Sequence, residues 1–141
     1  MIPDFAGQTI DIARIDWGLH FWTSENWEFV IECPIVVSVQ RDDGVEQSAF
    51  DPAVSERPLP PELEPIVGAR IDQVLVSGAG DLSIQLPGLH LTVPATEMYE
   101  AWHVIGKRGE MFICSPGGEL MHFPPLAETS AQDDEAPGEE T

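Results

Sequence analysis

The side chains best suited to chemistry in this chain are four histidines and two cysteines, and no local motif gathers them. The histidines are His20, His90, His103 and His122, and no two of them lie within five residues of each other. Structural zinc sites normally show ligands only a few positions apart. We therefore expect no bound metal and no cofactor. Only a pocket that His20, His90 and His103 line together, by converging across a sheet, would reverse this expectation.

The cysteines do not suggest a catalytic thiol. A cysteine nucleophile needs a neighbouring group that lowers its pKa. Cys114 instead closes the apolar run Met111–Ile113, and Cys33 precedes Pro34. The two lack the CxxC spacing of redox and zinc motifs, so we expect buried free thiols.

Established catalytic motifs are also missing from the sequence. It contains no phosphate-binding loop, dinucleotide fingerprint, GxSxG elbow, HExxH pair or EF-hand loop. An enzyme can lack all of these, but a non-catalytic protein is the interpretation that we favour.

The charge balance restricts the possible partners. The chain has 25 acidic and 6 basic residues, a formal net charge of −19. The last sixteen residues hold six of the acids and no base, so residues 1–125 keep a charge of −13. Such a molecule repels nucleic acid and anionic membranes and attracts a basic protein.

Two groups of residues are candidates for contact with such a partner. Acids gather around one expected hairpin, where they would steer a cation. Tryptophans in the N-terminal third would supply an apolar contact, because tryptophan is enriched at binding hot spots. The candidates are Asp42, Asp43, Glu46, Asp51, Trp17 and Trp22.

Composition also predicts the domain boundaries and the compartment. No apolar run approaches the roughly 20 residues that span a bilayer. The N-terminus has no basic segment followed by an apolar one, so we expect a cytoplasmic protein. Residues 126–141 are acidic and contain no aromatic residue, which predicts a disordered tail after a single β-rich domain over residues 1–125.

Short alternating segments separated by glycine and proline predict a mostly β fold. Tight turns are expected around Gly44, Gly80, Gly109 and Gly117. One short helix is expected within Pro60–Val67. The expected strands are Thr9–Ile15, Leu19–Thr23, Trp27–Ile31, Ile35–Gln40, Val45–Phe50, Arg70–Ser77, Leu82–Leu86, Leu89–Val93, Ala101–Ile105, Glu110–Cys114 and Leu120–Phe123.

The chain also contains a weak internal repeat. Gly7–Asp11 (GQTID) is similar to Gly68–Asp72 (GARID), and each begins a strand followed by further short strands. This predicts two similar meander halves that pack face to face, as an antiparallel sandwich or a partly open barrel.

The C-terminal half carries the most distinctive strings, Tyr99–Trp102 (YEAW) and Pro116–Leu120 (PGGEL). With these strings the chain resembles a family of small, uncharacterised actinobacterial proteins that share a domain of unknown function. The resemblance implies a small β-rich domain and no activity, cofactor or site. Independently of it, we expect Tyr99 and Trp102 to be core residues that define the fold.

Three functions remain open at this point. The first is a non-catalytic acidic protein-binding domain, in its most concrete form an immunity-type protein that neutralises a basic toxin. The second is a small-molecule or metal-binding β domain with enzymatic activity. The third is a structural or accessory domain.

Overall fold

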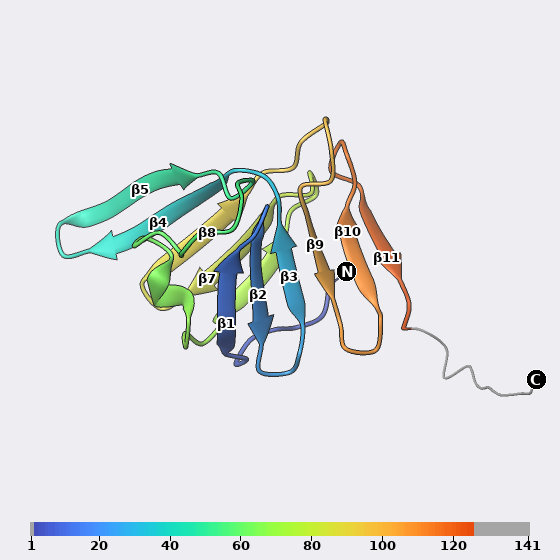
Figure 1. The fold of residues 1–141 in the computed structure, drawn as a ribbon, viewed down its shortest axis with the longest axis horizontal. Coiled ribbons are helices and arrows are strands. Elements are labelled where there is room, and N and C mark those ends of the chain that lie inside the picture. The colour runs from blue at the N-terminus through green and yellow to red at the C-terminus, as the bar shows by residue number, and fades with distance from the viewer. Residues whose placement is uncertain (1, 126–141) are drawn as a thin grey trace, which may run out of the picture.

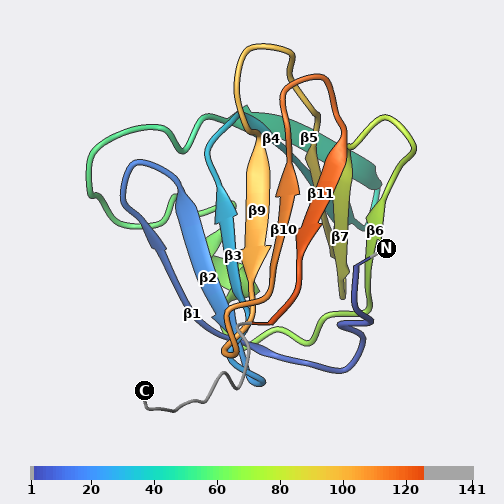
Figure 2. The ribbon, with the colours of Figure 1, turned by 90° about the vertical axis from the view of Figure 1, so that its right-hand side faces the viewer.

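A computed structural model describes residues 2–125 as two antiparallel β-sheets that face each other (Figures 1 and 2). The predicted tail, residues 126–141, lies outside the described residues. The six-stranded sheet has the order β1-β2-β3-β9-β10-β11 and the five-stranded sheet the order β5-β4-β8-β7-β6. The strands are β1 (Ile10–Ile15), β2 (Leu19–Thr23), β3 (Glu28–Ile31), β4 (Ile35–Arg41), β5 (Gly44–Phe50), β6 (Gln73–Val76), β7 (Leu82–Leu86), β8 (Leu89–Val93), β9 (Trp102–Ile105), β10 (Met111–Cys114) and β11 (Leu120–Phe123).

The predicted sandwich and all eleven predicted strands are confirmed, with two local differences. The sixth strand begins at Gln73 rather than Arg70, because the chain before it pairs with the N-terminal segment. The expected helix is only a 3-10 turn, Glu64–Ile66. Pro65 explains this, since a proline removes a donor and disfavours helical geometry in the residue before it.

Side chains from both sheets fill the space between them. In β2 and β7 every second residue is buried, as alternation predicts. The rings of Phe21 and Phe29 stack with their centroids 4.6 Å apart. Trp102 is completely buried, as predicted, but Tyr99 is 45% exposed and its predicted core position is wrong. Tyr99 lies in the connection before β9, outside the strands that form the core.

The glycines of the PGGEL string hold the two sheets together at one end of the molecule. The turn Ser115–Glu119 packs directly on the turn Ser77–Asp81, so closely that a Cβ on Gly118 would overlap the carbonyl oxygen of Ala79. The carbonyl of Gly80 accepts hydrogen bonds from Trp102 Nε1 at 3.0 Å and from Cys114 Sγ at 3.4 Å. These contacts support the fold-defining interpretation of Trp102 and Gly118.

The two halves are equivalent, but they do not form one sheet each. The first half is a three-stranded meander, β1–β3, followed by the hairpin β4–β5. The second half is the meander β6–β8 followed by the hairpin β9–β10, with β11 added. Each hairpin crosses to the other half's sheet, where β4 pairs with β8 and β9 pairs with β3. The similar halves thus form the predicted sandwich, but each sheet contains strands from both halves.

The two similar segments of the sequence pair with each other. They run antiparallel through a bridge between Thr9 and Arg70. Their hydrogen bonds are symmetric: Gly7 N–H to the Ile71 carbonyl at 2.8 Å, Gly68 N–H to Ile10 at 2.6 Å, Ile10 N–H to Ala69 at 2.9 Å and Ile71 N–H to Gln8 at 2.7 Å. The sequence repeat thus marks an approximate two-fold axis that relates the halves, as expected for a duplicated unit.

Candidate functional site

The predicted acidic residues lie on the β4–β5 hairpin and just beyond it. Asp42 and Asp43 form its exposed two-residue turn, which extends past the rest of the molecule (Figure 1). Glu46 accepts a hydrogen bond from Arg41 Nε at 2.9 Å. Asp51 follows β5, where its side chain accepts from the Ala53 N–H at 3.0 Å. Asp42 and Asp43 are therefore the acids of this group best placed to meet a partner.

The predicted tryptophans belong to the other sheet. Trp17 is 65% exposed in the β1–β2 turn, with a left-handed φ of 57°. Trp22 is half-buried on the outer face of β2, and the Arg14 guanidinium lies 5.2 Å from its ring centroid. The structure therefore does not join the tryptophans and the acidic hairpin into one site, since the hairpin extends from the five-stranded sheet.

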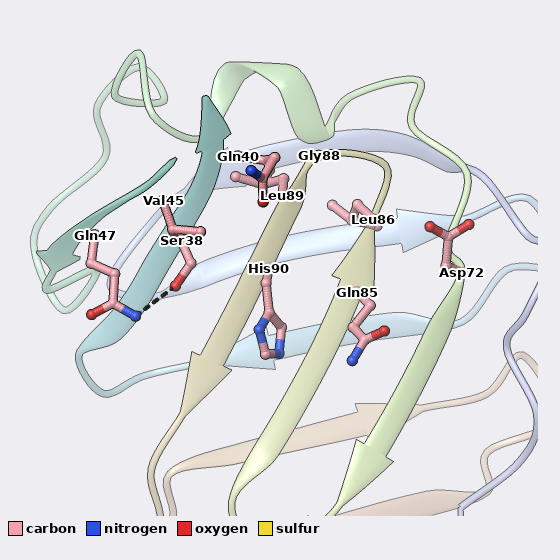
Figure 3. Close-up of a pocket in the computed structure, with 10 residues that line it drawn as sticks. All are labelled: Ser38, Gln40, Val45, Gln47, Asp72, Gln85, Leu86, Gly88, Leu89 and His90. Carbon is pink, nitrogen blue, oxygen red and sulfur yellow. Dashed lines mark hydrogen bonds between the residues drawn. The ribbon is translucent and has the colours of Figure 1, made fainter. Parts of the chain in front are cut away.

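A polar, uncharged row of cross-strand neighbours crosses the outer face of the five-stranded sheet: Gln47, Ser38, His90, Gln85 and Gln73. The adjacent row on the same face is mixed, and its Leu75 is 49% exposed. Gln47 donates to Ser38 at 3.1 Å, and His90 Nε2 lies 2.6 Å from the hydroxyl of Ser83. The row crosses a shallow cavity of about 460 Å³ (Figure 3). This is the ordinary composition of a solvated sheet face.

The outer face of the six-stranded sheet is different, and Figure 2 looks onto it. Two rows of cross-strand neighbours run over all six strands. Ile12, Met121 and Phe123 are between 43% and 59% exposed, although nothing in a monomer requires apolar side chains there. We call this surface the apolar face; its members are Ile12, Trp22, Val30, Ile105, Met111, Ile113, Met121 and Phe123.

The duplication allows the outer faces of the two sheets to be compared residue by residue. Because the strands pair equivalently in both sheets, each residue of the polar row has an equivalent residue in one row of the six-stranded sheet. The equivalent pairs are Gln73 and Ile12, Gln85 and Trp22, His90 and Glu28, Ser38 and Ile105, and Gln47 and Met111. The fold itself accepts polar residues at these positions, so the apolar side chains are not needed to build the sheet.

Few charges interrupt the apolar face. Glu28 is the one acid in its two rows, and its Oε2 lies 3.3 Å from Nδ1 of His20. The other ring nitrogen of His20 lies 3.1 Å from the carbonyl oxygen of Asp16. The one arginine in these rows is Arg14, which lies over Trp22. In a chain with 25 acids, this face is almost free of negative charge.

Acids instead lie along one end of the apolar face. They occupy the turns and connections next to β1, β3, β9 and β11, and they are Asp16, Glu32, Glu100 and Glu119. At the opposite end, in the β2–β3 and β9–β10 turns, Lys107 and Arg108 lie beside Glu25 and Glu110, so the charges there are balanced. The surface therefore has an apolar centre and one acidic end. Such a distribution fixes the orientation of a docking protein as well as attracting it.

The histidines do not gather into one site. Among residues 2–125 no three His, Cys, Asp or Glu side chains are grouped to hold a metal ion. His20 and His103 lie on the six-stranded sheet and His90 on the five-stranded one, so the three do not line a common pocket. His122 stacks on Phe112 with ring centroids 4.3 Å apart. The histidine pocket that would favour an enzyme is not formed.

Both thiols are buried, as predicted. Burial, with smaller effects from Cys114, Asp51 and Glu32, raises the pKa of Cys33 to about 11. Burial also raises the pKa of Cys114. Neither thiol is therefore activated as a nucleophile near neutral pH.

The raised pKa of Cys33 predicts a loss of stability in alkali. A thiol that titrates higher in the folded state stabilises it fully below pH 9, and this contribution is lost between pH 9 and about 11. The free energy of unfolding should fall there by up to about 1.4 kcal/mol per pH unit. Urea titrations at several pH values measure this fall. It should be shallower in Cys33→Ala, and an equally steep fall in that variant would contradict the assignment to Cys33.

The fold and its surfaces define a duplicated β-sandwich in which a polar row on one outer face corresponds to a mostly apolar row on the other. The chain matches a family model described as "Family of unknown function (DUF6188)" over residues 1–124, so it belongs to that family. The predicted relationship to a domain of unknown function is thereby confirmed; the actinobacterial origin stays a prediction. No curated protein and no solved structure matches the chain. Within residues 2–125 no helix has the length and apolar character to cross a membrane.

Proposed function

We propose that this protein is a non-catalytic protein-binding domain that docks a basic partner on its apolar face. The observation that carries the proposal is the apolar face itself, since Ile12, Trp22, Ile105 and Met111 have polar residues at the equivalent positions of the other sheet. Burying exposed apolar area in an interface is favourable by roughly 25 cal/mol per Å². A tryptophan and two methionines match the residue types enriched at protein interfaces.

The charge of the molecule favours a basic partner. Residues 1–125 carry a charge of −13, and four acids lie along one end of the face. An apolar centre with an acidic end suits a protein that presents an apolar patch with lysine or arginine beside it. An immunity-type protein that neutralises a basic toxin is the most concrete form of this proposal, by analogy of size and charge.

The test exchanges side chains between equivalent positions of the two sheets. Ile105→Ser and Met111→Gln together install the residues found at the equivalent positions Ser38 and Gln47. We expect binding to weaken at least tenfold, while the thermal midpoint stays close to the wild-type value because the changes are on the outer face. The partner is captured from native lysate with the wild-type protein, identified and purified, and its affinity for each variant is then measured by calorimetry.

The matched control is Gln47→Ala with Gln85→Ala, on the polar row. It should leave the affinity unchanged. If this control loses the partner and the apolar-face variant keeps it, the docking surface is the polar row. If the captured partner is acidic, the electrostatic part of the proposal is wrong.

Charge reversal in the β4–β5 turn should change the rate of association more than the rate of dissociation. Asp42→Lys with Asp43→Lys removes two acids from an exposed turn and replaces them with cations. We expect severalfold slower association at low salt, with dissociation nearly unchanged. At about 1 M salt, where the screening length is about 3 Å, the variant and wild type should associate at similar rates. Stopped-flow measurements over a salt series give both rates, and an unchanged association rate at low salt would exclude steering by this turn.

A further inference from the structure

We infer that the partner binds in part by β-strand addition, pairing an extended segment of its chain with the free edge of β11. This inference rests on the proposed function and specifies how the apolar face is used. The occupant to which we commit is an extended segment of a basic protein. Its side chains alternate, with apolar residues on the side of Met121 and Phe123.

The edges of the two sheets are not equally open. At the outer edge of β1, Arg70 forms a β-bridge with Thr9, and Arg57 forms one with Ile15. Both ends of this edge are therefore already paired. A register irregularity between Ile10 and Ile12 further disrupts that edge. At β5, the exposed ion pair of Arg41 and Glu46 places charge beside the edge, as natural edges often do.

The edge of β11 has none of these protections. Its sequence, Leu-Met-His-Phe, contains no acid, lysine, arginine or proline. It pairs with β10 on one side, and no strand within residues 2–125 pairs with its other side. Its main-chain N–H and C=O groups on that side are a template for another strand.

The side chains next to this edge specify the incoming strand. Both rows of the six-stranded sheet end at β11, on Met121 and Phe123, which are 43% and 46% exposed. An added strand would continue both rows, so its residues two apart would bury these side chains. The opposite side of that strand would meet a cavity of about 800 Å³ between β11 and β6, lined partly by Ile2, Val74 and Leu120.

Two neighbouring features set the length and charge of the segment. Pro124 and Pro125 directly follow β11 and lack the N–H groups that would extend the pairing. Glu119 stands at the start of the strand and attracts a cation. The matching segment is therefore a short run of alternating apolar residues flanked by lysine or arginine.

A peptide pair tests the main-chain pairing without altering the protein. The probe is fluorescein-labelled Lys-Lys-Val-Thr-Val-Thr-Val-Lys-Lys. Its control, Lys-Lys-Val-Pro-Val-Pro-Val-Lys-Lys, keeps the charge and the valines but removes two main-chain donors. Anisotropy titrations with the full-length protein should give at least tenfold weaker binding for the proline peptide. Amide hydrogen exchange should slow at residues 120–123 when the first peptide is added.

The other outcomes each overturn the inference. Equal binding of both peptides, no binding of either, or protection at Gln73–Val76 in β6 excludes strand addition at β11. Protection of residues 120–123 without peptide, beyond that given by the pairing with β10, assigns the edge to a second copy if it depends on protein concentration, and to residues 126–141 if it does not. Should strand addition fail while Ile105→Ser with Met111→Gln still releases the captured partner, the apolar face remains the docking surface without edge pairing.

Discussion

Trp102→Ala is expected to lower the free energy of unfolding by about 3–5 kcal/mol, enough to unfold many small domains. Trp102 is completely buried between the sheets, and its Nε1 donates to the Gly80 carbonyl at 3.0 Å. Alanine would leave a cavity and would also leave that carbonyl without one of its donors. Urea denaturation followed by circular dichroism measures the loss.

Trp102→Phe separates the effect of the cavity from the effect of the lost hydrogen bond. It keeps most of the apolar ring and removes the hydrogen bond, so its cost should be clearly smaller than that of alanine. If Trp102→Ala instead folded with wild-type stability and failed only to bind its partner, Trp102 would be a binding residue and its core assignment would be wrong.

Gly118→Ala is expected to be strongly disruptive, at about 2–5 kcal/mol. Gly118 has a φ of +94°, which strains any residue with a Cβ, and that Cβ would overlap the backbone of Ala79. The two turns would have to separate, although they join the sheets at this end. The thermal midpoint and the urea midpoint should both fall.

The neighbouring glycine provides the control. Gly117 has a nearly identical φ of +89°, but a Cβ there would meet nothing within 4 Å. Gly117→Ala should therefore show the conformational strain alone, about 1 kcal/mol. If the two variants were equally unstable, overlap between the turns would contribute nothing, and the close packing of Ser77–Asp81 on Ser115–Glu119 would not hold the sheets together.

The strands were predictable because their signals are local. Alternation in Leu89–Val93 and the glycines in the turns depend only on neighbouring residues, and they located these elements correctly. The pairing of β3 with β9 depends on residues that are far apart in the chain, which no local pattern encodes. For that reason the sequence predicted a sandwich of similar halves and missed the exchange of hairpins between them.

The apolar face was missed for a related reason. Met111–Cys114 has no polar residue on either parity, a pattern that is also typical of a strand buried on both sides. The run nevertheless indicated an apolar outer face, since in a two-layer sandwich one side of every strand must face outward. The predicted core position of Tyr99 was wrong for a different reason. The sequence between Tyr99 and Trp102 does not show where the connection ends and β9 begins.

The exchange of hairpins has a consequence for how the chain folds. Both central pairings, β3 with β9 and β4 with β8, join strands from opposite halves, so neither sheet is complete until the second half has been synthesised. A chain emerging from the ribosome would present β3 and β4 with open edges and the apolar inner sides of β1–β3 uncovered. Such long-range pairing folds slowly and exposes the nascent chain to aggregation. The strong negative charge of the first half, through mutual repulsion, would keep these intermediates apart.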